Sequence, residues 1–151
     1  MFDEAITLQS VSKAYGSTQI LDDVSLALPQ GARAGLVGAN GAGKTTLLRI
    51  IAGLSSPSVG DVHLKTADDT PRPKGSPVAL VPQGKAVFSN VTVDEVIAIA
   101  AAMNRGLWDP EPVYEWLDGF DVPRDRLCGK LSGGERSHVS IALALGRRVP
   151  F

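Results

Sequence analysis

The chain has 151 residues, of which 44% are hydrophobic and 21% are charged, and its formal net charge is −1. This length and composition fit one globular domain with a hydrophobic core, and the near-zero charge argues against a broad surface for nucleic acid or anionic lipid. The longest apolar run, 96–103, is too short to cross a membrane, and the single Cys128 cannot form an internal disulfide, which fits a reducing cytosol.

Two segments with alternating apolar residues open the chain. The segments 6–11 and 20–28 each predict a half-buried strand. A turn-like stretch, 13–17, separates them, and the residues at 29–31 end the second strand. We expect an antiparallel sheet over residues 1–31.

A glycine-rich segment follows, with the sequence Gly38-Ala39-Asn40-Gly41-Ala42-Gly43-Lys44-Thr45-Thr46. It fits the pattern G-x-x-x-x-G-K-[ST], in which backbone N–H groups surround phosphates at the start of a helix. The context agrees, because the apolar run 33–37 predicts a buried strand before the loop and 45–52 predicts a helix that ends at Gly53. A glycine-rich turn with a solvated lysine is the alternative, and the fixed spacing of the motif disfavours it.

The residue types in this loop suit phosphate chemistry. Gly38, Gly41 and Gly43 permit positive φ and let the main chain approach phosphates without a Cβ in the way. Lys44 supplies positive charge to the β- and γ-phosphates, and the Thr45 hydroxyl is placed to ligate Mg²⁺.

The sequence of the middle of the chain predicts two further strands. A short strand at 61–65 and a surface loop at 66–77, rich in proline, precede the apolar run 78–81, which Pro82 closes. A continuous apolar run of this kind indicates a buried parallel strand. Gln83 comes just past its carboxyl end, where open α/β sheets place ligand-binding residues.

Two helices come next. Thr92 and Glu95 form a capping box that begins a helix through residue 103. The apolar spacing at 111–119 predicts an amphipathic helix. These helices interrupt the α/β pattern, and we interpret them as a small helical subdomain inserted in the fold.

A second hydroxyl-plus-glycine motif follows, with the sequence Leu131-Ser132-Gly133-Gly134-Glu135-Arg136. Ser132 and Glu135 predict a capping box, and the N–H groups of the helix that it begins form a second candidate anion site. A capped helix with no ligand is the alternative. The order of phosphate loop, strand-end glutamine and Leu-Ser-Gly-Gly resembles the nucleotide-binding domain of ATP-binding cassette (ABC) proteins over essentially the whole chain.

The resemblance implies an α/β fold with a P-loop NTPase core built on a parallel sheet. An N-terminal antiparallel β subdomain and an inserted helical subdomain complete the single domain. Its expected parts are an antiparallel β part at 1–31, the P-loop core at 32–83, the helical subdomain at 84–131 and the signature helix at 132–151.

The resemblance also implies ATP and Mg²⁺ as cofactors. Tyr15 would stack on adenine, Gln83 would reach Mg²⁺ and the attacking water, and Ser132 would contact the ATP of an opposite subunit. Catalytic roles fall to Lys44, Gln83 and Ser132, and metal ligation to Thr45 and Gln83. The expected nucleotide-binding residues are Tyr15, Gly38, Asn40, Gly41, Ala42, Gly43, Lys44, Thr45, Thr46, Ser132, Gly133 and Gly134. A packed aromatic at Tyr15 and a polar turn residue at Gln83 stay open as alternatives.

The function that the resemblance implies is that of an ATP-hydrolysing subunit of an ABC membrane transporter. Such a protein is peripheral on the cytoplasmic face of the membrane, bound to a separate transmembrane permease subunit. Two nucleotide-binding domains form a head-to-tail dimer, and nucleic acid is not a partner. A soluble, ribosome-associated ABC ATPase and a non-hydrolysing ATP-binding fragment are the alternatives.

The sequence departs from the family pattern at several positions. Glu135 stands where glutamine is commoner, and His138 and Leu143 stand where arginine is usual, which removes positive charge near the expected dimer interface. No apolar strand ending in Asp-Glu follows the signature helix. We therefore expect the C-terminal strands of the core, the Walker B aspartate, the catalytic glutamate and the switch histidine to be missing. On this interpretation the chain is the N-terminal part of a longer protein and is inactive alone.

Overall fold

A computed structural model describes residues 4–65, 78–82 and 87–149 and divides the chain into two compact units. The first unit extends to Val78 and contains strands and one helix. The second unit covers Ala79–Val149 and is helical. Among the described residues, no helix is long and apolar enough to cross a membrane.

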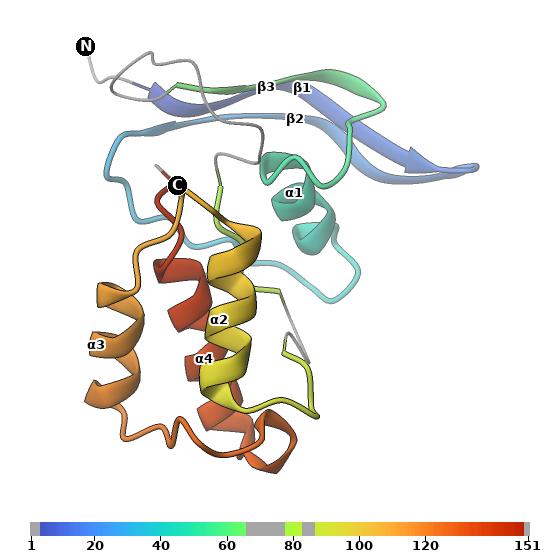
Figure 1. Cartoon of the computed structure of the whole chain (residues 1–151). Helices are drawn as coiled ribbons and strands as arrows, with labels where there is room; N and C mark the ends of the chain where they lie inside the picture. Colours follow the sequence, from blue (N-terminus) through green and yellow to red (C-terminus); the bar gives the residue numbers. More distant parts are fainter. Residues whose placement is uncertain (1–3, 66–77, 83–86, 150–151) are drawn as a thin grey trace. The chain divides into compact units, whose positions relative to one another are not determined.

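The first unit is built on a three-stranded sheet (Figure 1). Strands β1 (Glu4–Tyr15), β2 (Thr18–Pro29) and β3 (Val59–Leu64) lie in the order β2-β1-β3, and both pairings are antiparallel. The predicted antiparallel sheet is therefore confirmed, and β3 confirms the short third strand with an earlier start. The predicted turn at 13–17 is shorter than expected, because β1 continues to Tyr15.

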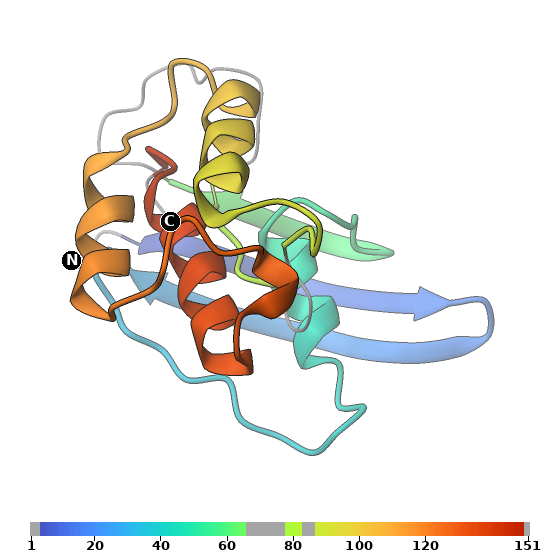
Figure 2. The ribbon, with the colours of Figure 1, turned by 60° about the horizontal axis from the view of Figure 1, so that its bottom comes forward.

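Helix α1 (Lys44–Ile51) packs on this sheet (Figure 2). Its buried residues join the inward-facing residues of β1 and β2 in one apolar cluster, which consists of Leu8, Val11, Leu21, Leu47 and Ile50. The helix ends in a Schellman motif, because Gly53 adopts a φ of 70° and the N–H groups of Gly53 and Leu54 donate to Ile50 and Arg49. The predicted helix and its end at Gly53 are confirmed.

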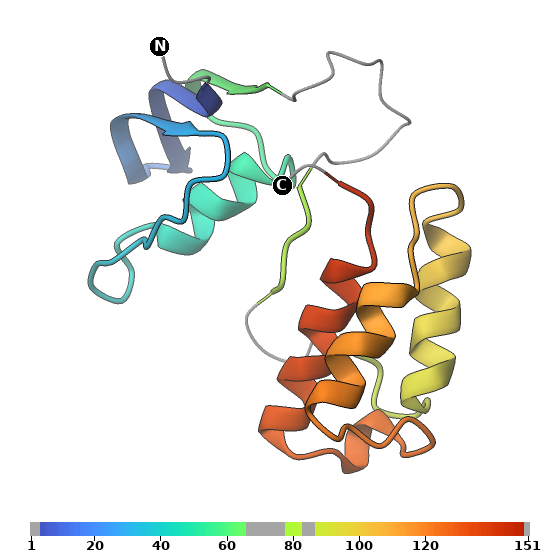
Figure 3. The ribbon, with the colours of Figure 1, turned by 90° about the vertical axis from the view of Figure 1, so that its left-hand side faces the viewer.

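The second unit is a group of three helices (Figure 3). They are α2 (Val93–Met103), α3 (Glu111–Gly119) and α4 (Gly133–Leu145), with a short 3₁₀ turn, η1 (Cys128–Lys130), before α4. Their apolar faces meet in a core that includes Val93, Val96, Ile97, Val113, Leu117, Cys128, Val139 and Ala142. The predicted helices and the capping box at Thr92 are confirmed.

The predicted parallel strands are not formed in the described part of the chain. Residues 33–37 lie outside every strand and are exposed, with Val37 93% accessible, and residues 78–81 also carry no strand. A strand needs a ladder of hydrogen bonds to a neighbouring strand, and neither segment belongs to the sheet that the described residues form. Both strand predictions are therefore wrong, and the parallel sheet of the predicted fold class is not confirmed.

Other expectations are not settled by the fold. The surface loop at 66–77 and Gln83 lie outside the described residues. Helix α4 packs with α2 and α3 in the second unit. The finer division of the domain at residues 31, 83 and 131 stays a prediction.

Candidate functional site

The glycine-rich loop leads directly into α1. Gly43 is the N-cap residue with a φ of 88°, and Gly41 has a φ of 84°, whereas Gly38 lies outside the left-handed region. A Cβ on Gly43 would lie 2.7 Å from Leu21 Cδ2 and 2.9 Å from the Ile20 carbonyl oxygen. The sequence therefore needs glycine at this position for two reasons, the backbone conformation and the close contact with β2.

The N-terminus of α1 is open to an anion. Among the residues that the structure describes, no side chain caps it, and its first turn contains no acidic residue. The first hydrogen bond of the helix joins the Leu47 N–H to the Gly43 carbonyl over 2.9 Å, and residues 38–42 are exposed. Unbonded N–H groups and the helix dipole favour negative charge at such a terminus.

Lys44 closes back over the loop. Its Nζ donates hydrogen bonds to the carbonyl oxygens of Gly38 at 2.7 Å and Ala39 at 2.6 Å. The Ala42 N–H also donates to the Ala39 carbonyl at 3.2 Å, which tightens the loop. The ammonium group is thus held inside the loop, where phosphate oxygens can replace the carbonyl oxygens as its hydrogen-bond acceptors.

The residues present fit Mg²⁺ only together with a nucleotide. Thr45 and Asn40 are exposed and Thr46 is half-buried. The described residues contain no cluster of three or more His, Cys, Asp or Glu side chains. Mg²⁺ is commonly held by few protein ligands plus substrate phosphates and water, so a single hydroxyl from Thr45 suits it. The second expected ligand, Gln83, lies outside the described residues.

Tyr15 ends β1 with 52% of its surface exposed. It pairs with Thr18 across the hairpin, about 10 Å along β2 from the Leu21 that touches the loop. Lys13 places its Nζ 5.1 Å from the centre of the Tyr15 ring and donates to the Ser56 carbonyl. Sequence reasoning missed Lys13, although residues two apart on a strand share a face.

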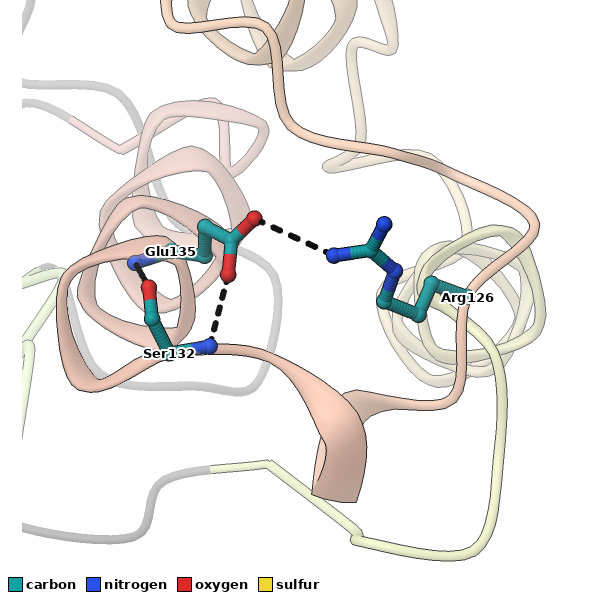
Figure 4. Close-up of polar contacts among 3 residues, drawn as sticks. All are labelled: Arg126, Ser132 and Glu135. Carbon is teal, nitrogen blue, oxygen red and sulfur yellow. Dashed lines mark hydrogen bonds and ion pairs between the residues drawn. The ribbon is translucent and has the colours of Figure 1, made fainter.

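The second motif forms the start of α4 (Figure 4). Ser132 Oγ accepts the Glu135 N–H at 3.1 Å, and Glu135 Oε2 accepts the Ser132 N–H at 2.6 Å, which confirms the predicted capping box. Gly133 and Gly134 lie in the exposed first turn. The Ser132 N–H and hydroxyl, helped by the guanidinium of Arg126, hold the pKa of Glu135 below its ordinary value.

Arg126 is the residue near this motif that sequence reasoning missed. Its Nη1 lies 3.5 Å from Glu135 Oε1. Arg126 belongs to the loop before η1, so its distance from Glu135 in sequence matches neither a helix nor a strand period. Only the path of that loop brings the two side chains together, and the sequence pattern carries no signal for it.

The two residues that replace arginine in α4 take part in packing. The His138 ring stacks on Phe120, with the ring centres 3.9 Å apart and the planes at 24°. Leu143 packs against the core of the second unit. Both side chains therefore contribute to the helical unit itself.

The predicted site residues thus fall into separate groups. Tyr15 and the loop 38–46 belong to the first unit, and Ser132, Gly133 and Gly134 belong to the second. Their assignment to nucleotide binding stays a prediction at this point.

Comparisons with known proteins cover most of the chain. A family model described as "ABC transporter" matches residues 21–151. A probable sulfate/thiosulfate import ATP-binding protein, CysA, from Chlorella vulgaris is 35% identical over 146 residues, which cover 93% of this chain and 62% of that protein. The Fe(3+) ions import ATP-binding protein FbpC from Escherichia coli (strain K12) is 31% identical and covers 93% of this chain and 42% of its own length. The chain therefore spans less than two thirds of each of these relatives.

Solved structures are similar as well. An ATP binding subunit of an ABC transporter matches with a TM-score of 0.75 and 24% identity over 92% of this chain and 60% of its own. An ATP-binding cassette of an ABC transporter matches with a TM-score of 0.70 and 26% identity over 94% of this chain and 64% of its own.

Proposed function

Because the chain belongs to the ABC transporter family, we propose that it is the ATP-binding subunit of a membrane transporter, specifically of an importer. The relatives described above are named as import ATP-binding proteins, which supports the direction of transport. The observation that carries the proposal is the N-terminus of α1, which is uncapped, free of acidic residues and flanked by Lys44. This arrangement is suited to the phosphates of a nucleotide.

In this proposal the first unit binds ATP. The N–H groups of the loop 38–46 receive the phosphate oxygens, Lys44 exchanges its carbonyl partners for the β- and γ-phosphates, and the exposed ring of Tyr15 stacks on adenine. Mg²⁺, when bound, neutralises charge on the β- and γ-phosphates, and Thr45 and Gln83 are its proposed protein ligands. The polar contacts of the loop support the phosphate part of this assignment most directly.

The second unit supplies the other half of a composite site. We assign Ser132, Gly133 and Gly134 to the γ-phosphate of an ATP held by a second nucleotide-binding domain, in a head-to-tail dimer. Hydrolysis in the complete transporter, with Lys44, Gln83 and Ser132 at the phosphates, would then drive a permease subunit at the cytoplasmic face of the membrane. The exposed, glycine-rich first turn of α4 supports this role.

The test is ATP binding by the 151-residue chain and its Lys44→Ala variant. Because a hydrogen bond from a charged donor is removed, we expect ATP affinity to fall about tenfold to a hundredfold. Isothermal titration calorimetry with Mg²⁺-ATP measures it. Arg49→Ala is the matched control, because it removes a positive charge from the exposed far end of the same helix. Equal affinities in the wild type and Lys44→Ala would contradict the proposed site.

A further inference from the structure

The loop that carries Arg126 is fixed to the start of α2. The Arg126 carbonyl accepts the Val93 N–H at 3.2 Å, Leu127 forms a bridge with Thr92, and the Cys128 N–H donates to the Val91 carbonyl at 2.8 Å. These contacts surround Thr92, the N-cap residue of α2. The backbone of Arg126 is therefore held in place by the start of α2, while its side chain stays 51% exposed.

Glu135 gives the N-terminus of α4 a charge that the N-terminus of α1 does not have. One oxygen, Oε2, is used by the capping box, and the other, Oε1, lies toward Arg126 (Figure 4). An uncompensated carboxylate in a first helical turn lowers the positive potential that the N–H groups present to an anion. The nearby guanidinium restores that potential.

We propose that Arg126 is a positioning residue for phosphate binding at the start of α4. It neutralises Glu135 and draws Oε1 away from the first turn, so that Ser132, Gly133 and Gly134 face the phosphate without a net negative neighbour. This inference rests on the proposed function, in which that turn binds a nucleotide held by a second copy of the domain. It explains how the first turn of α4 can bind phosphate with a glutamate at position 135, where the family pattern favours glutamine.

The geometry argues against a mainly structural role for the pair. At 3.5 Å, between side chains that are 51% and 27% exposed, the ion pair contributes little to folding. Removal of the Arg126 side chain therefore leaves the fold of the second unit intact. Any effect of this removal on phosphate binding therefore comes from the changed charge next to Ser132.

The experiment measures ATP-dependent self-association of the 151-residue chain by analytical ultracentrifugation, with the ATP concentration at half-maximal association as the readout. We expect Arg126→Ala to raise that concentration about two- to fivefold, the range for one charge at a helix N-terminus. Arg126→Lys restores the wild-type value. In the Glu135→Gln background, Arg126→Ala has no effect, because no carboxylate is left to neutralise.

Carbon-detected NMR titration of Glu135 separates this inference from the proposed function. Loss of the Arg126 charge raises the pKa of Glu135 if the two groups interact as described. An unchanged pKa, or an Arg126→Ala effect that persists in Glu135→Gln, overturns the role of Arg126. If the wild type binds ATP but does not associate, and Ser132→Ala behaves the same way, the composite site of the proposed function is overturned instead.

Discussion

Helices α1 and α4 both begin at a glycine-rich motif, but they begin in opposite ways. At α1 the N-cap is a left-handed Gly43, no side chain in the described part of the chain accepts an N–H of the first turn, and Lys44 brings positive charge. At α4 the N-cap is Ser132, whose side chain and that of Glu135 satisfy two N–H groups. One terminus keeps its donors for a ligand, and the other uses part of them internally.

This difference indicates unequal roles in anion binding. Helix α1 can bind a phosphate with its own N–H groups and its own cation. At α4 the capping box already uses the N–H groups of Ser132 and Glu135, which leaves the N–H groups of Gly133 and Gly134 as the donors of the first turn. In the proposed function, the second terminus therefore completes a site that another chain has begun and does not hold the phosphate alone.

The largest expected effect comes from a substitution that disrupts the left-handed backbone conformation at the N-cap of α1, which is one of the features that distinguish it from α4. Gly43→Ala places a Cβ against Leu21 and the Ile20 carbonyl at a φ of 88°, so we expect the first unit to lose about 2–4 kcal/mol of stability and its ATP binding. Hydrogen–deuterium exchange in β2 and α1 measures the loss.

Gly38→Ala is the matched control for that substitution. Its Cβ would meet Ala42 Cβ at 3.6 Å, an ordinary contact, and its backbone is not left-handed. We expect a change below about 1 kcal/mol. A loss as large as that of Gly43→Ala would show that any side chain in the loop is harmful, and that the contact with β2 is not the reason.

A smaller effect is expected from the cap of α4. Ser132→Ala removes the acceptor for the Glu135 N–H and destabilises the second unit by about 1 kcal/mol. Thr92→Ala removes the equivalent acceptor at α2 at a similar cost, and so provides the control. Both tryptophans lie in the second unit, so their fluorescence during urea unfolding reports on it. If only Ser132→Ala also abolishes ATP-dependent association, the hydroxyl acts on the nucleotide and not only on the helix.

Local signals in the sequence predicted much of this structure. Both capping boxes, the helix 111–119 and the end of α1 at Gly53 depend on residues within a few positions of each other, and each is confirmed. The parallel strands at 33–37 and 78–81 were predicted from apolar content alone. A strand also needs a neighbour, which no local pattern can supply, and these two predictions were wrong.

Within the candidate site, some residues could likewise be predicted from local sequence patterns and others could not. The loop and the Ser132 motif could be found because their residues stand at fixed spacing. Arg126 could not, since its contact with Glu135 depends on how the loop before η1 is tied to α2. Lys13 beside Tyr15 lies between these cases, because the strand period allows the contact but does not require it.

The smallest expected effect concerns the charge that distinguishes α4 from α1. The Ser132 N–H, the Ser132 hydroxyl and Arg126 lower the pKa of Glu135 in the folded chain. A carboxyl whose folded pKa is lowered stabilises the fold above its unfolded pKa, about 4.3, and that contribution is lost as the pH falls through the folded value.

Thermal unfolding of the second unit, followed by tryptophan fluorescence, should therefore shift to lower temperature in acid more in the wild type than in Glu135→Gln. Glu115→Gln, which removes an exposed carboxylate from α3, controls for net charge. Parallel acid profiles for the wild type and Glu135→Gln would show that the carboxylate at α4 carries no specific interaction, and that the two helix termini differ in geometry alone.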